Sequence, residues 1–290
     1  MGPYMMFRVG RIQVHPLQLV VIPALILSWE VMALYLRGRN PLVATVFPSL
    51  REVFGRDLPG LAAFGQQTQP GHVQALSSYG GALLVLMRES VSTLGRVLGG
   101  TICGIVLGVT TGLIMGWTPA LRRLLTPPIE FVRMIPSLAL LPLFMLWFGG
   151  REIGTLLFVT LAIFIILVIN TVGAVRNVPP IYAQMARTLG ATRLQVFRTI
   201  IIPAIIPGLI GAVRVALGSS WAIVLAGEYL SVQSGLGRLM ILSEMFFFTG
   251  RMVVIVLLFI IYSLILNIAF LKLARRLTRW MPGQLGGRAV

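Results

Sequence analysis

The sequence has little of what soluble enzymes use for chemistry. It holds only 8 Asp and Glu residues, 2 histidines and 1 cysteine among 290 residues. The single cysteine, Cys103, excludes an internal disulfide framework and a thiolate metal site. The two histidines, His15 and His72, are predicted to lie on opposite sides of a membrane. We therefore expect no catalytic residue and no metal site in this chain.

A nucleotide-binding phosphate loop is also missing from the sequence. The G-x-x-x-x-G-K-[ST] pattern needs a lysine followed by Ser or Thr, but the only lysine, Lys272, is followed by Leu273. The chain is therefore not expected to hold ATP in this way, and energy for any active process must come from other subunits.

Apolar residues dominate what is present, at 57% of the sequence, with a mean hydropathy of +0.92. Runs of about 20 apolar residues are long enough to cross a bilayer as helices. Six such runs occur, at residues 17–36, 91–117, 129–148, 153–174, 205–230 and 252–273. Alternating patterns of the kind that membrane barrels need are missing. The predicted fold class is therefore all-α, a polytopic membrane protein with about six transmembrane helices.

The net charge of +16 would suit a nucleic-acid partner, but the positions of the basic residues favour another explanation. With the N-terminus in the cytoplasm, the segments on that side carry Arg and Lys without Asp or Glu, whereas the other side mixes both signs. This is the positive-inside bias, which orients membrane spans. We predict cytoplasmic termini, contact with the lipid bilayer and no nucleic-acid partner.

These features divide the chain into parts. They are a cytoplasmic N-terminal lead at 1–16, a first transmembrane helix at 17–36, an extracytoplasmic loop at 37–90, a transmembrane core at 91–273 and a basic cytoplasmic tail at 274–290. In the loop, Ser49 is predicted to cap a short helix.

A polar interruption at residues 176–207 separates two apolar spans. Two prolines at 179–180 suit the first turn of a helix, and Gly190 supplies a left-handed stop. Thr192 can cap a second helix, which is predicted to end at Pro203. Both helices are basic and amphipathic. We interpret the pair as a cytoplasmic surface offered to another protein.

The second span carries a stripe of small residues. Glycine recurs at every fourth position, at Gly100, Gly104, Gly108, Gly112 and Gly116. Such a stripe predicts close packing against another helix. Arg96, near the outer end of this span, is interpreted as reaching the lipid headgroups, with a contact to substrate as the alternative.

The third span and the residues just before it contain several prolines, which bend helices and free backbone carbonyls. They are Pro127, Pro128, Pro136 and Pro142. A gate or pore lining would use such a bend, and a kinked structural helix is the alternative.

The fifth span has one polar helical face. Spacings of four, three, four and three connect Arg214, Gly218, Trp221, Leu225 and Glu228. Arg214 is roughly 14 Å from the cytoplasmic start of the span, close to the midplane. A charge there is costly unless it faces a partner or water. Two interpretations stay open, a translocation path for an anionic solute and a structural contact with an acid or a carbonyl. The candidate path residues are Arg214, Gly218, Trp221, Glu228 and Pro136.

A family resemblance is carried by residues 184–203, which read QMARTLGATRLQVFRTIIIP. This segment resembles the EAA loop of the permeases of binding-protein-dependent ABC importers, whose pattern is Glu-Ala-Ala, three residues, Gly, nine residues and Ile-x-Leu-Pro. Gly190, Ile200 and Pro203 keep the spacing. By this resemblance the ATPase-coupling loop comprises Gln184, Met185, Ala186, Leu189, Gly190, Thr192, Ile200 and Pro203.

The segment departs from the family pattern at three positions. Gln184 and Met185 stand where the family has Glu and Ala, and Ile202 stands where it has Leu. The departures remove any ion pair that the family's Glu would make, whereas the spacing still implies a helix, a glycine turn and a second helix.

The resemblance extends over most of the chain. Permeases of nitrate, bicarbonate, taurine and aliphatic-sulfonate importers have, in the same order, blocks similar to RMIPSLALLPLFMLWFG, NTVGAVRNVPP, ARTLGAT and GAVRVALGSSWAIVLAGEYL. It implies a permease subunit of the bacterial inner membrane that moves a small anionic solute inward by alternating access. The implied partners are a second permease chain, expected as a homodimer, two ATPase subunits that hold ATP and Mg, and an extracytoplasmic solute-binding protein. No cofactor is expected on this chain.

Other readings remain open at this point. Some members of this branch handle pyrimidine-like vitamin precursors, and the permease could pair with a sister chain instead of a second copy. An ion-coupled secondary transporter would need intramembrane acids, for which Glu30 and Glu228 are the only deep candidates. A membrane-embedded serine enzyme built on Ser219 would lack a well-placed histidine.

Overall fold

The computed structural model describes residues 7–9, 12–14, 16–39, 46–68, 78–231 and 234–279. Within these ranges the regular secondary structure is helical apart from one pair of three-residue strands, so the all-α prediction is confirmed. The strands β1 (Phe7–Val9) and β2 (Ile12–Val14) pair antiparallel. This short hairpin was not predicted from the sequence.

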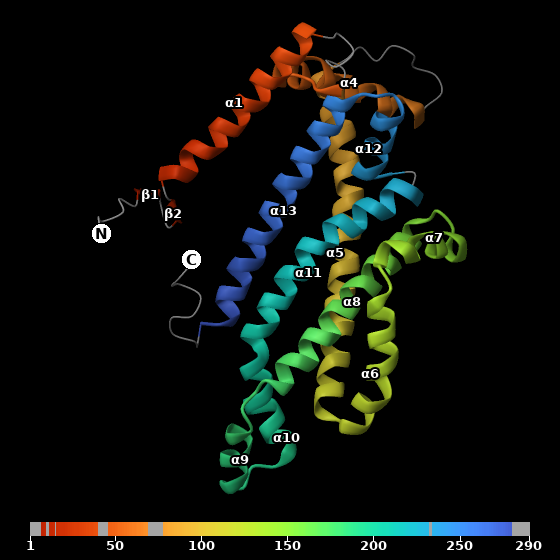
Figure 1. The fold of residues 1–290 in the computed structure, drawn as a ribbon. Helices are drawn as coiled ribbons and strands as arrows, with labels where there is room; N and C mark the ends of the chain where they lie inside the picture. Colours follow the sequence, from red (N-terminus) through yellow and green to blue (C-terminus); the bar gives the residue numbers. More distant parts are fainter. Residues whose placement is uncertain are drawn as a thin grey trace. The chain divides into compact units, whose positions relative to one another are not determined.

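The chain divides into two compact units, which are described separately. One comprises Met1–Leu86 and Met240–Val256, and the other Met87–Leu239 and Leu257–Val290. The elements in chain order up to residue 68 are α1 (Pro16–Arg39), α3 (Leu50–Glu52), the π-helical η1 (Val53–Asp57), α4 (Leu58–Gly60) and the 3-10 helix η2 (Leu61–Thr68). They are followed by α5 (Tyr79–Trp117), α6 (Pro119–Met134), α7 (Ser137–Phe148), α8 (Glu152–Arg176), α9 (Pro180–Thr188), α10 (Arg193–Val196), the π-helical η3 (Phe197–Ile201), α11 (Ile202–Ser231), α12 (Leu236–Met245) and α13 (Thr249–Leu277) (Figure 1).

Within the described ranges, four helical stretches are long and apolar enough to cross a membrane, namely α5, α8, Arg193–Tyr229 and α13. They contain most or all of the predicted spans 91–117, 153–174, 205–230 and 252–273. The pair α6 and α7 adds a fifth crossing if it is counted as one bent span. The first predicted span lies within α1. The total of six crossings therefore stays a prediction.

The predicted third span, residues 129–148, is two helices and not one. The axes of α6 and α7 differ by 96°. Between them Ile135 and Pro136 have extended backbone, with ψ of 122° and 123°. The residue before a proline is disfavoured in the helical conformation, so the chain breaks at this proline. The other three prolines lie inside helices, at Pro127, Pro128 and Pro142.

In the first unit, α3 is held to α1 through carboxylates. Ser49 and Glu52 form the predicted cap as a reciprocal capping box. Glu30 of α1 accepts a hydrogen bond of 2.8 Å from the backbone N–H of Leu50, and Arg37 of α1 pairs with Glu52 at 2.8 Å. Glu30, the acid of the first predicted span, thus has a structural partner.

Asp57 lies buried beside the first turn of α13, in the same unit. A Cβ added at Gly250 would overlap the carboxylate of Asp57, so this position has no room for a side chain. Burial raises the pKa of Asp57 above its ordinary value of 3.8, although the charges of Arg56 and Arg251 act in the opposite direction. The guanidinium of Arg251 also lies 3.9 Å from the ring centroid of Phe248.

In the second unit, the glycine stripe of α5 packs directly on α8, which confirms the predicted close helix packing. A Cβ at Gly104 would lie 2.7 Å from the Cβ of Ile163 and 2.9 Å from the carbonyl oxygen of Thr160. An added Cβ would come within 3 Å of an α8 side chain at every member of the stripe, Gly100, Gly104, Gly108, Gly112 and Gly116.

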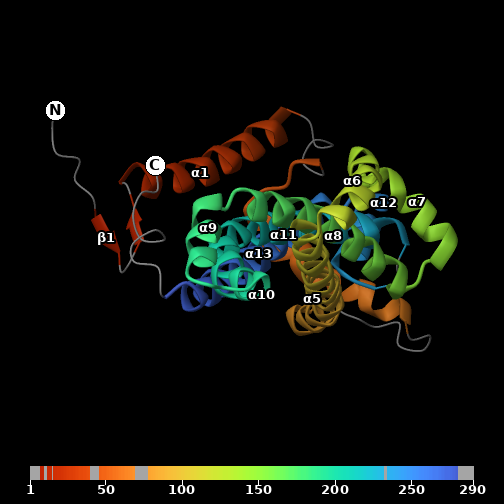
Figure 2. The ribbon, with the colours of Figure 1, turned by 90° about the horizontal axis from the view of Figure 1, so that it is seen from below.

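The apolar core of this unit lies mainly between α7, α8 and α11. Phe158, Ile163 and Leu167 of α8 and Val224 of α11 are fully buried there. In both ribbon views α11 lies beside α8 (Figure 1, Figure 2). Another side of α11 faces α13. There the ring of Trp221 on α11 makes an edge-on contact with the ring of Phe259 on α13, and both residues line a groove between the two helices.

Candidate functional site

The helix pair within residues 176–207 forms with Gly190 at its turn. Gly190 has φ +82°, a conformation that costs a residue with a side chain about 1–2 kcal/mol. Its N–H donates to the carbonyl of Arg187 at 2.9 Å, and the N–H of Ala191 donates to the carbonyl of Ala186 at 3.0 Å. These are the two bonds of a Schellman motif. The space around Gly190 is open, so the backbone conformation alone requires glycine here.

Thr192 begins the second helix through a reciprocal capping box. Its hydroxyl accepts from the N–H of Gln195 at 3.3 Å, and the Gln195 side chain accepts from the N–H of Thr192 at 2.7 Å. The prediction that this helix ends at Pro203 is wrong, because α10 continues through η3 into α11. In η3 the N–H of Ile202 bonds to the carbonyl of Phe197, five residues back. The helical hydrogen-bond pattern therefore changes register just before Pro203. The helix continues past this proline although proline has no N–H to donate.

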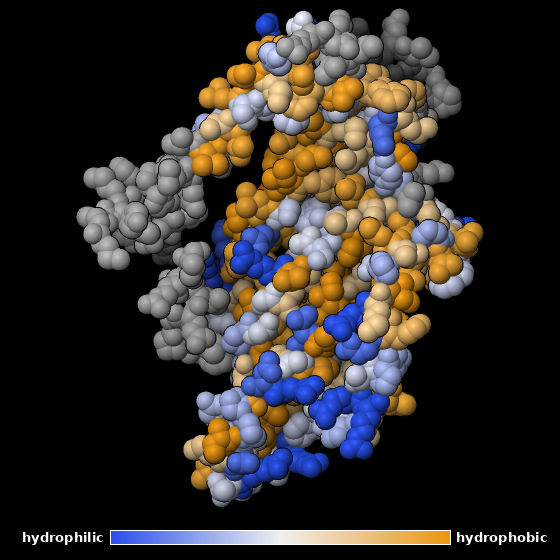
Figure 3. Space-filling model, in the orientation of Figure 1, coloured by the Kyte–Doolittle hydropathy of each residue, from blue (hydrophilic) through white to orange (hydrophobic). Residues whose placement is uncertain are grey.

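The apolar side chains of this helix pair face outward. Met185 is 58% exposed and Leu189 is 88% exposed, and Ile181 and Leu194 are also exposed. Gln184, where the sequence departs from the family pattern, is exposed as well. The exposed arginines around them are Arg187, Arg193 and Arg198. Figure 3 shows hydrophilic surface gathered over this end of the unit, across α9, α10 and the adjoining end of α6. Apolar side chains rimmed by basic ones are typical of a docking surface.

The second helix of the pair is anchored to the membrane helices. Val196 is buried, and the ring of Phe197 lies 4.6 Å from that of Trp117 at the end of α5. Ile200 and Pro203 line a hollow of about 670 Å³ between the end of α8 and the start of α11. A force applied to α9 and α10 would thus reach α5 and α11 through packed side chains.

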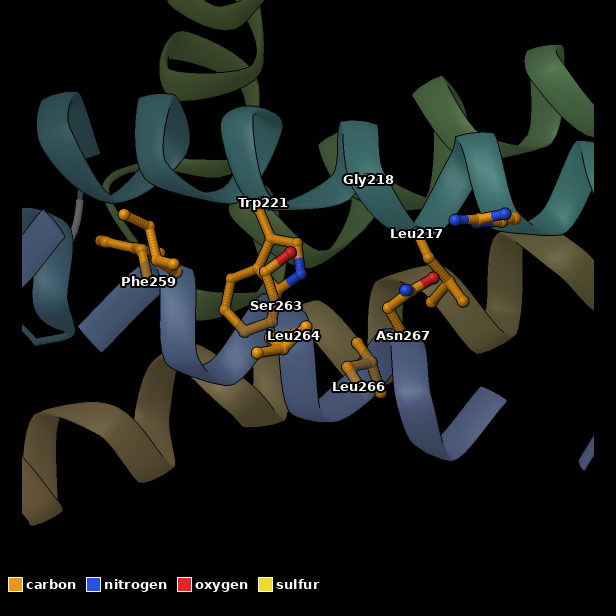
Figure 4. A pocket seen from close by; sticks show the side chains of 10 residues that line it. Leu217, Gly218, Trp221, Phe259, Ser263, Leu264, Leu266 and Asn267 are labelled. Carbon is orange, nitrogen blue, oxygen red and sulfur yellow. The ribbon is translucent and has the colours of Figure 1, made fainter. Parts of the chain in front are cut away.

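Three of the predicted path residues lie together on α11. Arg214, Gly218 and Trp221 line a groove of about 570 Å³ between α11 and α13. Figure 4 shows Trp221 on α11 opposite Ser263 on α13, with Asn267 further along the same helix. The remaining lining is apolar and consists of Leu217, Phe259, Ile260, Leu264 and Leu266. The groove therefore combines one cation, Arg214, and two neutral polar side chains, Ser263 and Asn267, with an otherwise apolar lining.

Arg214 is exposed in this groove. Within the part of the chain that the structure describes, it makes no ion pair and no hydrogen bond, unlike Arg96. The structural alternative, a contact with an acid or a carbonyl of the same chain, therefore finds no partner among these residues. Arg214, which the sequence predicts to lie near the bilayer midplane, is thus a cation that faces a groove.

Glu228, predicted on the same helical face, does not line the groove. Its carboxylate is fully buried, with Oε1 2.6 Å from Nη1 of Arg96. Oε2 accepts hydrogen bonds from the hydroxyl of Thr93 at 2.9 Å and from the N–H of Gly237 at 3.0 Å. Arg96 also pairs with Glu152 at 3.1 Å. The predicted headgroup contact of Arg96 is wrong, because its side chain is 4% exposed and enclosed by this cluster.

Sequence reasoning missed this cluster, although part of it was visible. Glu89, Thr93 and Arg96 follow spacings of four and three and share one face of α5. The Glu89 carboxylate accepts from the N–H of Gly235, and the Thr93 hydroxyl accepts from the N–H of Leu236 at 2.9 Å. The partners on α11 and in the following turn are more than 130 residues away along the chain. The residue spacing on α5 alone could not identify these distant partners.

Pro136, the remaining candidate of the path, lies at the break between α6 and α7 and is not part of the groove lining. Next to the break, Arg133 and Ser137 line a separate hollow of about 120 Å³. The structure thus brings together Arg214, Gly218 and Trp221 and places Glu228 and Pro136 elsewhere.

Comparison with known proteins gives consistent matches. The family model described as "Binding-protein-dependent transport system inner membrane component" matches residues 104–281. A Brucella melitensis protein, called a probable ABC transporter permease protein, is 34% identical over 222 residues, which are 76% of this chain and 90% of that protein. The taurine transport system permease protein TauC of Escherichia coli is 31% identical over 195 residues, 67% of this chain and 71% of TauC.

A solved structure of the MetNI methionine ABC transporter in an inward-facing conformation resembles the fold. Its matching chain superposes with a TM-score of 0.59 at 21% identity, over 67% of this chain and 97% of that chain. This likeness concerns the fold alone.

Proposed function

Because the chain belongs to the family of binding-protein-dependent transport system inner membrane components, we propose that it passes a small anionic solute along the groove at Arg214. Members of this family are multi-pass inner-membrane permeases of ABC importers, which work with separate ATPase subunits and a solute-binding protein. The observation that carries the proposal is the exposed guanidinium of Arg214, which has no ion partner among the described residues.

The lining of the groove favours an organic sulfonate as the solute. A sulfonate presents several acceptor oxygens to a planar guanidinium, which can bind two of them at once. Ser263 and Asn267 add neutral polar groups, and Leu217 and Trp221 provide apolar wall for the organic part. The relation to TauC, a taurine transport system permease, supports the same class of solute.

The coupling role belongs to the helix pair at residues 179–203 in this proposal. Two copies of the chain would form the permease, and each exposed pair, centred on Met185 and Leu189, would seat in one of two ATPase subunits. ATP and Mg would be held there, so this chain would not itself be an enzyme. Closure of the ATPases would press on α9 and α10, and the contact between Phe197 and Trp117 would transmit the movement to α5. The bundle would then alternate between outward and inward access, with the termini in the cytoplasm.

The test is taurine uptake by vesicles that contain the permease, its ATPase and its binding protein. Arg214→Gln should lower uptake about tenfold or more, since a hydrogen-bonded charge contributes about 1.5–3 kcal/mol. Arg214→Lys should recover part of it, because the charge stays but the planar fork is lost. Arg276→Gln, which removes an exposed arginine on α13 outside the groove lining, is the control and should transport normally. Undiminished uptake by Arg214→Gln would reject the proposed path. Uptake without any ATPase would instead favour an ion-coupled transporter.

A further inference from the structure

The turn after α12 has a phenylalanine where helices ordinarily use glycine. Phe247 has φ +55° and is the one non-glycine residue with positive φ in the described ranges. Its N–H donates to the carbonyl of Glu244 at 2.9 Å, and the N–H of Phe248 donates to the carbonyl of Ser243 at 2.8 Å. These are the same two Schellman bonds that end α9, where Gly190 occupies the equivalent position. A bulky residue in the left-handed region is strained, and such strain persists where the surroundings or the function maintain it.

The strained turn is held by a cation–π contact at Phe248, whereas the three side chains before Phe248 are exposed. The ring of Phe248 stacks 3.9 Å from the guanidinium carbon of Arg251, and the ring of Phe246 lies 6.1 Å from that of Phe248. Met245, Phe246 and Phe247 are 66%, 53% and 79% exposed. We call these three residues, two phenylalanines and the methionine before them, the aromatic tip. Three large apolar side chains in a row on one turn would be unfavourable in water, and glycine at 247 would avoid both the strain and the exposure.

The aromatic tip directly precedes a membrane span, and this position identifies its partner. α13 begins at Thr249 and has 29 residues. At 1.5 Å per residue it is ~43 Å long, whereas the hydrocarbon core of a bilayer is about 30 Å thick. The apolar run of α13 begins at Met252, after Arg251, so we expect its first turn in the interfacial layer, where aromatic side chains are enriched and bury their apolar surface. Further along α13, in the same unit, Val256 is also an exposed apolar side chain.

We propose that the aromatic tip inserts into the interfacial layer of the lipid bilayer. The left-handed conformation at Phe247 turns the chain between α12 and α13, and the ring at this position then contacts lipid at the level of the headgroups. This inference concerns the chain and its bilayer and holds whether or not Arg214 binds solute.

A fluorophore at position 247 tests the proposal. Cys103→Ala removes the native thiol, and Phe247→Cys is labelled with the environment-sensitive dye NBD. The full chain is reconstituted in phosphatidylcholine vesicles with or without lipid that carries a doxyl quencher near the headgroup. We expect blue-shifted emission and loss of fluorescence with the doxyl lipid. Leu189→Cys, on the exposed end of α9, is the matched control and should show neither effect.

Two outcomes would overturn the proposal. One is quenching by aqueous iodide at position 247 that equals the quenching at 189, without any effect of the doxyl lipid. The other is protection of the label from iodide by added solute-binding protein alone, which would assign the aromatic tip to a protein interface. If Phe247→Cys fails to fold, Phe246→Cys at the neighbouring exposed position gives the same readout.

Discussion

Arg96 of α5 and Glu228 of α11 form a buried ion pair, with Nη1 2.6 Å from Oε1 and with side-chain exposures of 4% and 0%. Removing two charges from water is costly, so such a pair persists only where further hydrogen bonds satisfy it. Thr93 and Gly237 supply those bonds to the carboxylate. The pair therefore ties the end of α11 and the turn after it to α5.

Loss of one charge from this pair should destabilise the chain strongly. We expect Glu228→Gln to lower the free energy of unfolding by about 3–5 kcal/mol, because the buried guanidinium of Arg96 would lose its fully buried counter-charge. Chemical unfolding in mixed micelles measures the change. Glu152→Gln is the control, since its carboxylate also touches Arg96 but is 73% exposed, and should cost about 1 kcal/mol or less. Equal effects of the two variants would contradict the assigned importance of Glu228.

One methyl group added to the glycine stripe should separate α5 from α8. In Gly104→Ala the new Cβ would meet Ile163 at 2.7 Å and the backbone oxygen of Thr160 at 2.9 Å. Overpacking of this kind costs about 1–3 kcal/mol. The same substitution at Gly95, on the same helix, meets nothing within 4 Å and should gain about 1 kcal/mol from helix propensity. The thermal midpoints of the two variants in detergent should therefore move in opposite directions, and parallel shifts would argue against the close contact.

The turn at Gly190 should matter for coupling and not for insertion. Gly190→Val forces a β-branched residue to φ +82° and should distort the turn between α9 and α10 at a cost of about 1–3 kcal/mol. Gly190→Asn is the control, since asparagine tolerates the left-handed conformation. In the assembled transporter we expect the valine variant to lose most solute-stimulated ATP hydrolysis with normal membrane insertion, and the asparagine variant to keep it. Full stimulation in the valine variant would be incompatible with a lever at this turn.

Asp57 should make stability depend on pH in the mildly acidic range. Its pKa is raised by burial, so between 3.8 and its folded value the folded chain binds more protons than the unfolded chain. Stability from this group is therefore present below pH 3.8 and is lost as pH rises through the folded pKa. We expect the thermal midpoint of the natural chain, relative to Asp57→Asn, to fall as pH rises above about 4 and then to level off. A constant difference across this range would show that Asp57 ionises as in water.

Several local features could be read from the sequence because they depend only on neighbouring residues. The capping boxes at Ser49 and Thr192 and the left-handed Gly190 follow from residue types at fixed offsets. The glycine spacing on α5 predicted a close helix contact, and the structure shows that the partner helix is α8. The polar face of α11 singled out Arg214, which lines a groove in the structure.

Other features could not be predicted from the sequence pattern, because the same residue type has different effects in different structural surroundings. Pro136 breaks the chain into α6 and α7, whereas Pro142 is accommodated inside a helix. Pro203 does not stop its helix, because the π-helical turn before it shifts the hydrogen-bond register. The sequence offers no sign of which proline will find such compensation.

By itself the sequence determined an all-α membrane chain, its apolar spans and the helix pair around Gly190, since apolar run length, cap chemistry and glycine conformation are local properties. Only the tertiary structure decided how the two charges on α11 are used. Glu228 is neutralised by Arg96 from a helix more than 130 residues away, whereas Arg214 faces a groove and has no such partner among the described residues. The cost of an intramembrane charge depends on what packs against it, and that depends on the fold and not on the residue.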